Sequence, residues 1–392
     1  MFLINWIFYT SFFYVIVFPF LFPLNLVYLF FKNKSYNSHK KNTIDRITIL
    51  IPVYNEAKTI IDTLLHVKDI DFNGNLTIYL IDDNSTDNTR DRITDFIESN
   101  PDLSISLFSN NKRIGKAGIM NRFIPEIKDE IVLVLDANIR LAKDSLINMT
   151  SYFKKNTGIL FGNLILQKNH YSSITEEEIW YWNLETFLKR IQNSIGNITS
   201  PVGGFYLLRK SLFEKIPSEC LTEDMYLLLK ILSKNYSSKF CYKAKGYEFT
   251  EKSTVSEFKR KKRIMKGGFY ILGKFIHDKY SFKLKKVDMT NLILNKFMRW
   301  IYPILFFVSI IAALFDFKRN KISRTYLLLN FILFLLTAIE FIINTFLNTL
   351  LEEKRIRVRF FKKPLYFYTL MTSGIMALKK EHKGQRWEKD ER

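Results

Sequence analysis

Three short apolar runs, each followed directly by polar residues or proline, constrain the fold of this chain more than any other feature. The runs are Ile47 to Ile51 before Pro52, Leu76 to Ile81 before Asp82-Asp83-Asn84-Ser85, and Ile131 to Leu135 before Asp136-Ala137-Asn138. Such runs predict buried strands, and apolar spacing predicts a helix over Glu56 to Val67. The acidic turn after the second run can also cap a helix from Asp87. We therefore predict an α/β fold from Arg46 to about Tyr280, with the polar clusters gathered beyond the carboxyl ends of the strands.

The amino-terminal segment is long and uncharged. Phe2 to Phe31 contains no charged side chain, and it exceeds the roughly 20 residues that a helix needs to cross a bilayer. A signal peptide would carry basic residues before its apolar run, whereas the lysines here follow it, at Lys32, Lys34, Lys40 and Lys41. By the positive-inside rule, the chain is expected to enter the cytoplasm at Lys32.

Two further apolar segments lie towards the carboxyl end, over Trp300 to Phe315 and Thr325 to Leu351. Their composition and short connection predict a transmembrane helical hairpin. The connecting loop is itself basic and contains Lys318, Arg319, Lys321 and Arg324. The stretch from Lys354 is more basic still, so we expect it to remain inside. Pro364 to Leu378 is too short to span a bilayer and is expected to be interfacial or re-entrant.

The formal charge of +21 on 392 residues fits nucleic acid, an anionic membrane surface or a phosphate-rich substrate. No RNA-recognition signature, zinc finger or helix-turn-helix spacing occurs, so a nucleic-acid partner is not expected. The 36 Phe residues gather mainly in the terminal apolar runs, which favours membrane lipids as partners. Cys220 and Cys241 are too few for a disulfide framework, and the five histidines form no cluster that would indicate zinc.

Thr222-Glu223-Asp224 completes a set of acidic positions that begins at Asp83 and Asp136. Each position has an ordinary structural explanation as a turn or as a helix start, and Lys116 could equally be a solvated loop lysine. A sugar nucleotide, however, needs a carboxylate for its base, another with a metal for its diphosphate, and a third to deprotonate the attacking hydroxyl. The order of the acids, each at a strand end or helix start, favours this combined function over unrelated caps.

The motifs together resemble membrane-integrated family-2 glycosyltransferases, the group that includes cellulose, hyaluronan and poly-N-acetylglucosamine synthases. The resemblance covers almost the whole chain, over Ile51 to Glu56, Asp83 to Asp87, Gly115-Lys116-Ala117, Asp136-Ala137-Asn138, Tyr181-Trp182 with Glu185, Gly203 to Tyr206 with Arg209, Glu223-Asp224, Glu257 to Arg260 with Arg263 and Gly267, Lys296 with Arg299-Trp300 and Pro303, and Trp387 with Arg392. It implies a GT-A type, Rossmann-like nucleotide-diphospho-sugar transferase fold in a cytoplasmic domain, with transmembrane helices at both ends.

The resemblance also implies a role for each matching residue. The residues implied in donor binding are Glu56, Asp83, Lys116, Asp136, Arg260 and Arg263. Those implied in contacting the acceptor or ordering its loop are Glu223, Tyr181, Trp182 and Glu185. Glu56 and Asp83 would hold the nucleoside, and Asp83 would accept from the imide if the base is uracil. Asp136 and Asn138 would hold Mg²⁺ or Mn²⁺, and Asp224 would be the general base.

Two departures from the family pattern bear on the product. Asn138 supplies a neutral amide oxygen where many relatives have an acid, which should weaken metal binding. The QxxRW signature of processive synthases reads Arg260-Lys261-Lys262-Arg263-Ile264 here. The glutamine and the tryptophan on which an acceptor sugar would stack are therefore missing. Sugar transfer is better supported than the synthesis of long chains.

The expected activity is inverting, metal-dependent transfer of a sugar from a nucleotide-diphosphate donor, taken as a UDP-sugar, to a saccharide or lipid-linked acceptor, which gives a β-linkage. The alternatives are a single-addition transferase on a lipid-linked acceptor and an inactive nucleotide-binding subunit of a polysaccharide assembly with other proteins. The expected divisions are an anchor over 1–32, a cytoplasmic catalytic domain over 46–280, a transmembrane hairpin over 281–351 and a basic tail with an interfacial segment over 352–392. The protein is expected to be a multi-pass protein of the cell membrane.

Overall fold

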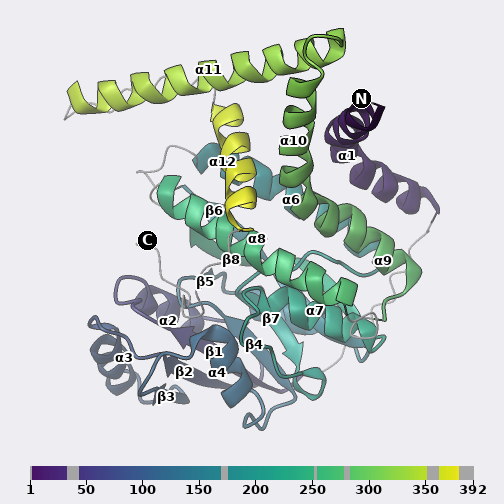
Figure 1. The fold of residues 1–392 in the computed structure, drawn as a ribbon. Coiled ribbons are helices and arrows are strands. Elements are labelled where there is room, and N and C mark those ends of the chain that lie inside the picture. The colour runs from purple at the N-terminus through teal and green to yellow at the C-terminus, as the bar shows by residue number, and fades with distance from the viewer. Residues whose placement is uncertain are drawn as a thin grey trace.

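The computed structural model describes residues 2–32, 44–168, 175–250, 254–277, 283–350 and 362–378. Within these residues lies one eight-stranded sheet with the order β3-β2-β1-β4-β7-β6-β8-β5 (Figure 1). The strands are β1 (Arg46–Val53), β2 (Asn75–Asp82), β3 (Ile105–Ser109), β4 (Ile131–Leu135), β5 (Arg140–Leu141), β6 (Thr157–Gln167), β7 (Phe205–Arg209) and β8 (Ser237–Phe249). Strands β3, β2, β1 and β4 run parallel, while β7 is antiparallel to both β4 and β6. The sheet is therefore mixed.

The three predicted strands are present as β1, β2 and β4. They lie next to one another, with β1 in the middle. The residues from Ile47 to Ile51 and all of β4 are buried. Parallel strands covered on both faces bury successive side chains, which explains why these runs are continuously apolar instead of alternating. Their polar carboxyl ends therefore meet at one edge of the sheet, as predicted.

Short helical segments connect the strands: α2 (Ile60–Lys68), α3 (Thr89–Glu98), α4 (Gly115–Phe123), α5 (Ser145–Tyr152), the 3-10 turn η1 (Lys210–Leu212) and α7 (Glu223–Ser233). The expected start of the first helix at Glu56 is wrong, because α2 begins at Ile60. Asn55 has a φ of 53°, and the amides of Thr59 and Ile60 both donate to the Glu56 carbonyl, at 3.0 and 2.9 Å. Residues 56–59 are therefore held in a turn.

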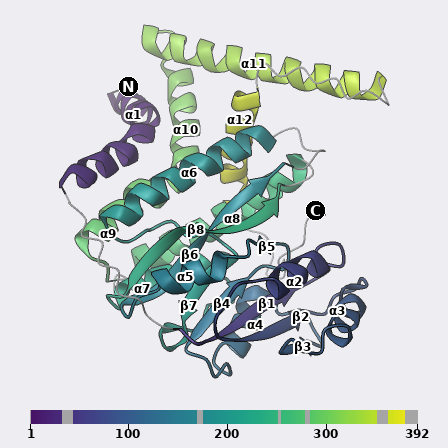
Figure 2. The same cartoon turned by 180° about the vertical axis from the view of Figure 1, so that it is seen from behind.

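A second group of helices lies on one side of the sheet (Figures 1 and 2). Its members are α1 (Phe2–Lys32), α6 (Thr175–Ile195), α8 (Thr254–His277), α9 (Lys286–Leu292), the π-helical turn η2 (Ile293–Phe297), α10 (Met298–Phe315), α11 (Lys321–Leu350) and α12 (Lys362–Met376). Helix α1 packs along α10, where the Tyr14 hydroxyl donates to the Met298 carbonyl at 2.8 Å. Helix α12, at the segment expected to be interfacial, packs against α8 and α10.

The structure departs from the predicted hairpin at α11. This helix runs across the end of α10 and does not return beside it (Figures 1 and 2). Polar contacts fix the crossing, because the hydroxyls of Ser309 and Tyr326 lie 2.7 Å apart and the Ser323 hydroxyl donates to the Asp316 carboxylate at 3.1 Å. The first turns of α11 are thereby tied to the last turns of α10.

One continuous helix in the described part of the chain, Lys286–Phe315, is long and apolar enough to cross a membrane. It comprises α9, η2 and α10. A shorter apolar helix covers Leu3–Val17 within α1. The basic stretches used to orient the chain, from Lys34 to Lys41 and from Lys354 to Arg359, lie outside the described residues, as do Trp387 and Arg392.

Candidate active site

Asp136 and Asp224 face the same backbone turn, Gly203-Gly204. The Asp136 amide, directly after β4, donates to the Gly204 carbonyl at 2.8 Å. Gly204 has a φ of +75°, and a Cβ at this position would collide with the Asp136 carboxylate. A Cβ at Gly203 would lie 3.5 Å from Oδ2 of Asp224. The turn therefore brings together the acid predicted at the metal and the acid predicted as the base, although they are far apart in the sequence.

Lys116 connects Asp136 to Glu223, the first acid of the Thr222-Glu223-Asp224 motif. Its ammonium lies 2.7 Å from Oδ1 of Asp136 and 2.9 Å from Oε1 of Glu223. Burial opposes the positive charge, but these two carboxylates outweigh it and raise the pKa of Lys116 well above its ordinary value. A permanent cation therefore lies where the diphosphate of a nucleotide sugar is expected.

Asp224 lies in the first turn of α7, whose N-cap is Thr222. The Met225 amide donates to Oδ1 of Asp224 at 2.8 Å. Burial and the adjacent Glu223 raise the pKa of Asp224 to about 6, while Lys116 acts in the opposite direction. A carboxylate with this pKa accepts a proton more readily than an ordinary aspartate and is still mostly ionised at neutral pH. These are the properties of a general base.

Asp83 binds the loop that leads to Lys116. Its Oδ1 accepts from the Asn110 side chain at 3.0 Å and from the Ile114 amide at 2.8 Å, and its Oδ2 accepts from the Gly115 amide at 2.7 Å. Asp83 therefore orders residues 110–116. A uracil imide would have to share a carboxylate that already accepts these bonds, so the contact to the base stays a prediction.

The predicted nucleoside end also contains Glu56, which is buried and accepts from the Thr59 hydroxyl. The Arg113 guanidinium, one residue before Ile114, lies 3.7 Å from the centroid of the Tyr54 ring. Arg113 is not among the site residues predicted from the sequence. Arg113 lies beside Tyr54 because Asp83 binds the amides of Ile114 and Gly115, the two residues that follow Arg113.

The protein would supply only some of the ligands of a divalent ion. The Asp136 carboxylate forms an ion pair with Lys116. The side-chain NH2 of Asn138 donates to Oε1 of Glu248 at 2.9 Å, so only the side-chain oxygen of Asn138 could be a ligand. Among the residues that the structure describes, no group of three or more His, Cys, Asp or Glu could hold a metal. Magnesium sites at diphosphates commonly use one or two protein oxygens and are completed by phosphate and water. Asp136 and Asn138 as ligands of such an ion, bound together with the donor, stay a prediction.

Tyr181 and Glu185 meet the start of α10. Arg299 donates to the Tyr181 hydroxyl at 3.0 Å and forms an ion pair with Glu185. Burial opposes ionisation of Glu185, but Arg299, Lys296 and Lys189 outweigh it and lower the pKa of Glu185 to about 2. These α6 residues therefore bind the helix that is the candidate membrane span.

Trp182 lies on the same helix and is anchored to the sheet. Its indole donates to the Leu164 carbonyl at 2.6 Å, and the Lys189 ammonium lies 5.0 Å from its ring centroid. Lys189 is only 3% exposed, and it interacts electrostatically with both Glu185 and Asp224. Lys189 is not among the site residues predicted from the sequence, although its position one helical turn after Glu185 indicates that the two side chains share a helix face.

The two arginines implied at the diphosphate lie on α8. Arg260 forms ion pairs with Glu257 of the same helix and Glu178 of α6. Arg263 precedes Gly267 by one helical turn, and Gly267 packs against Thr222 at the start of α7. The α8 face that carries Arg263 and Gly267 is therefore the face that packs at the start of the Thr222-Glu223-Asp224 motif. The roles of Arg260 and Arg263 at the diphosphate stay predictions.

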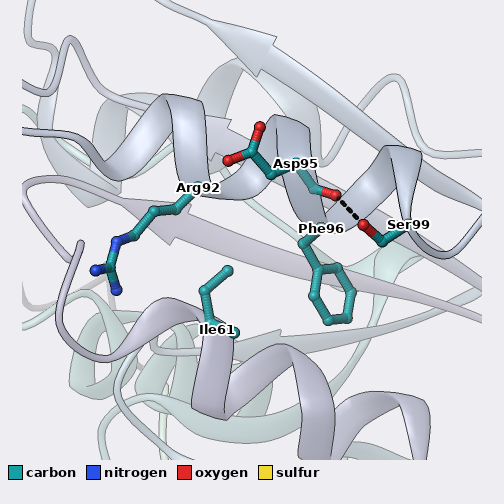
Figure 3. Close-up of a pocket in the computed structure, with 5 residues that line it drawn as sticks. All are labelled: Ile61, Arg92, Asp95, Phe96 and Ser99. Atoms are coloured by element: carbon teal, nitrogen blue, oxygen red, sulfur yellow. Dashed lines mark hydrogen bonds between the residues drawn. The ribbon is translucent and has the colours of Figure 1, made fainter.

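A separate shallow groove lies between α2 and α3 (Figure 3). It is lined by Ile61, Arg92, Asp95, Phe96 and Ser99. None of these residues belongs to the predicted site, and the Ser99 hydroxyl simply donates to the Asp95 carbonyl at 2.7 Å. The carboxylates at the Gly203-Gly204 turn, and not this groove, form the candidate active site.

The sequence is similar to those of known glycosyltransferases. The family model for glycosyl transferase family 2 matches residues 48–217. The poly-beta-1,6-N-acetyl-D-glucosamine synthase of Staphylococcus epidermidis is 26% identical over 353 residues, which cover 85% of this chain and 83% of that protein. The synthase of the same name from Staphylococcus aureus is 26% identical over 297 residues, 72% of this chain and 70% of that protein.

Among solved structures, the chain is similar to the mannosyltransferase PcManGT from Pyrobaculum calidifontis in complex with GDP-Man and Mn²⁺. The TM-score is 0.70 and the sequence identity 17%, over 95% of this chain and 97% of that one. The likeness shows that the mixed sheet has a GT-A-like glycosyltransferase fold. Residues 48–217 are thus a glycosyl transferase family 2 domain, and the chain is a glycosyltransferase related to the poly-β-1,6-N-acetyl-D-glucosamine synthases.

Proposed function

We propose that the chain transfers a sugar from a UDP-sugar to a saccharide or lipid-linked acceptor, with inversion and a β-linkage in the product. The observation that carries this proposal is the Gly203-Gly204 turn, against which both Asp136 and Asp224 lie. A donor whose diphosphate binds beside Asp136 would present its anomeric carbon to an acceptor held by Asp224. The names of the relatives make N-acetylglucosamine the first sugar to test.

In the proposed mechanism, Asp224 takes the proton of an acceptor hydroxyl as that oxygen attacks the anomeric carbon. The bond to the diphosphate breaks in the same step, so the configuration at the anomeric carbon inverts. Lys116, already next to Asp136, offers its ammonium to the charge that grows on the leaving diphosphate. Mg²⁺ or Mn²⁺ held by Asp136 and Asn138 would supply further positive charge there when bound.

The acceptor would approach from the side of α6 and α10. Tyr181 and Glu185 meet Arg299 there, at the start of α10 and within the apolar helix Lys286–Phe315. We propose that residues 46–280 form a cytoplasmic catalytic domain of a multi-pass membrane protein. In this proposal residues 1–32 anchor the chain, residues 281–351 belong to the membrane region and residues 352–392 form a basic tail.

The test uses detergent-solubilised protein, a panel of nucleotide sugars that includes UDP-N-acetylglucosamine, and mass spectrometry of the products. Asp224→Asn is expected to lower the transfer rate about 10²- to 10⁴-fold while UDP affinity stays near that of the parent, because a base acts on the acceptor proton. Asp95→Asn, the same change at an exposed acid in the α2–α3 groove, is the control. Near-normal turnover in Asp224→Asn would remove this residue from the mechanism, and no turnover of any donor by the parent would contradict the proposed activity.

Single addition to a lipid-linked acceptor is the second candidate. Ile264 stands where processive synthases carry the tryptophan of their signature, and it is 39% exposed. An isoleucine at this position offers no ring on which a growing chain could stack. Product length in the same mass spectra separates the candidates, since one added sugar per acceptor supports single addition and a ladder of lengths supports a synthase.

A further inference from the structure

Helix α8 carries two adjacent glycines that contact different parts of the molecule. A Cβ at Gly267 would lie 2.5 Å from Cγ2 and 2.9 Å from Oγ1 of Thr222, the N-cap of α7. A Cβ at Gly268 would collide with the indole of Trp300 in α10. Because packed atoms do not approach this closely, any larger residue at either position would push its neighbour aside. The close packing of α8 on these elements therefore depends on glycine.

We propose that Gly267 is a positioning residue for Asp224: it allows α8 to pack against Thr222 and thereby sets where the first turn of α7 holds the base. Asp224 follows Thr222 by two residues in the sequence. A displacement of Thr222 is therefore transmitted through a single helical turn to the Asp224 carboxylate. This inference rests on the proposed role of Asp224 as the general base.

The contact at Gly268 packs α8 against α10. Trp300 is buried, and its ring packs against Phe297 of η2 with centroids 5.6 Å apart. Gly268 thus fixes α8 against the helix that is the candidate membrane span, while Gly267 fixes α7 against α8. The two glycine contacts therefore fix the position of Asp224 relative to α10, the helix from whose side the acceptor is proposed to approach.

Helix α8 also provides a matched control. Glycine inside a helix is less favourable than alanine, so Gly→Ala should stabilise a helix wherever the new methyl group has room. At Gly273, in the same helix, no heavy atom of the described structure lies within 4 Å of an added Cβ. Gly→Ala is therefore expected to lower the stability of the protein at position 267 and to raise it slightly at position 273.

The experiment compares Gly267→Ala, Gly273→Ala and Gly267→Ala/Thr222→Ser, using the most active nucleotide sugar of the panel and UDP as the binding probe. Gly267→Ala is expected to lower kcat about 10- to 100-fold with UDP affinity unchanged, because small misplacements of catalytic groups are costly. It is also expected to move the acidic limb of the pH–rate profile, since the distance between Asp224 and its charged neighbours changes. Gly273→Ala is expected to match the parent in both. Thr222→Ser removes Cγ2, the closest atom, and is expected to restore part of the kcat of Gly267→Ala.

Equal kcat and pH profiles in the two alanine variants would overturn the proposal. A lower kcat with an unmoved acidic limb and no rescue by Thr222→Ser would also overturn it, because that pattern is merely structural. If Gly267→Ala does not fold, recovery of folded protein in the double variant supports the Gly267–Thr222 contact, and failure of the double variant contradicts it. Asp224→Asn, assayed in parallel, separates the two ideas. Activity in Asp224→Asn contradicts the proposed base, whereas its loss with indistinguishable glycine variants contradicts only the positioning role.

Discussion

Glu223 and Asp224 are adjacent acids with different surroundings. Glu223 forms an ion pair with Lys116, whereas Asp224 accepts from the Met225 amide and has its pKa raised to about 6 by burial and by Glu223. Environments that differ in this way assign different roles to neighbouring carboxylates. The geometry favours Asp224 for the proton transfer and Glu223 for holding Lys116.

The ionisation of Asp224 predicts how kcat depends on pH. The kcat is expected to fall as the pH drops through about 6, because protonated Asp224 cannot accept the acceptor proton. Glu223→Gln removes the neighbouring negative charge that raises this pKa, so its acidic limb should lie at lower pH than that of the parent. Initial rates at saturating donor measure both. An acidic limb that is the same in Glu223→Gln and in the parent would assign the ionisation to another group.

Lys116 leads to a second prediction. Its ammonium is bound to the Asp136 carboxylate at 2.7 Å, so it competes with any cation for that oxygen. Lys116→Met is therefore expected to raise the affinity of the nucleotide-free protein for Mn²⁺, measured by electron paramagnetic resonance titration. Lys112→Met changes an exposed lysine of the same loop and should leave that affinity unchanged. Equal Mn²⁺ affinities in the two variants would show that Lys116 does not compete.

The pairing of β4 with β7 explains why Asp136 lies against the Gly203-Gly204 turn. Strand β7 lies antiparallel beside β4, with Leu135 opposite Phe205, so the end of one strand adjoins the beginning of the other. Asp136 follows Leu135 and Gly204 precedes Phe205, which places Asp136 and Gly204 side by side.

The π-helical turn η2 directly precedes α10 and contains Lys296. Such turns occur frequently at functional sites, and here one adjoins the Arg299–Glu185 ion pair.

The anchoring of the loop over residues 110–116 by Asp83 is predicted to affect the affinity for UDP. Asp83→Ala removes the acceptor of the Ile114 and Gly115 amides, so the loop loses its anchor and Lys116 its position. Hydrogen bonds to a charged group typically contribute about 1.5–3 kcal/mol, so UDP binding should weaken about 10- to 100-fold. Calorimetric titration with UDP in Mg²⁺ or Mn²⁺ tests this, with Asp95→Ala as the control. UDP bound as tightly by Asp83→Ala as by the parent would place the donor elsewhere.

Over the whole molecule, the sheet and the apolar helices form two regions joined through α6 and α8 (Figures 1 and 2). Large apolar side chains are exposed on the helical side, with Trp6 at 59%, Phe13 at 64% and Phe331 at 61%. Surfaces of this kind need an apolar environment, which supports the proposed membrane location. The Asn320 amide donates to the Tyr9 hydroxyl at 2.6 Å, so the 316–320 turn lies beside the amino-terminal part of α1.

That proximity sharpens a prediction of topology. If the amino terminus lies outside, the 316–320 turn lies outside with it, despite its basic residues. Single cysteines at positions 320 and 37, in a background without the buried Cys220 and Cys241, would be labelled on intact cells with an impermeant reagent. We expect labelling at position 320 and protection at position 37. A cysteine at Asp95 in the catalytic domain is the control and should react only after permeabilisation.

Labelling at position 37 alone would reverse the orientation of the whole chain. Protection at both positions would instead make α10 and α11 a helical pair that lies on the membrane surface. The crossing of α11 over the end of α10 is compatible with either position of the 316–320 turn, so the labelling result decides between them.

The positions of the strands, and of the acids at their carboxyl ends, follow from the local sequence. Continuous apolar runs such as Ile47 to Ile51 leave a buried parallel strand as the simplest structure, and polar residues after such strands must reach one sheet edge. These are local properties, set by a few consecutive residues and by the period of a strand. The same locality explains the error at Glu56, where a backbone turn overrode the helical spacing.

The groups that surround each acid, in contrast, depend on how the chain folds in three dimensions. The contact of Gly204 with Asp136, the loop held by Asp83 and the position of Lys189 near Asp224 each join segments that are distant in the sequence. Such contacts depend on how the strands are ordered and on which helices pack together. The crossing of α11 was likewise decided by the pairing of Ser309 with Tyr326. Apolar composition specifies that a segment is buried or lies in lipid, but the direction in which a helix runs depends on the partners that satisfy its polar groups.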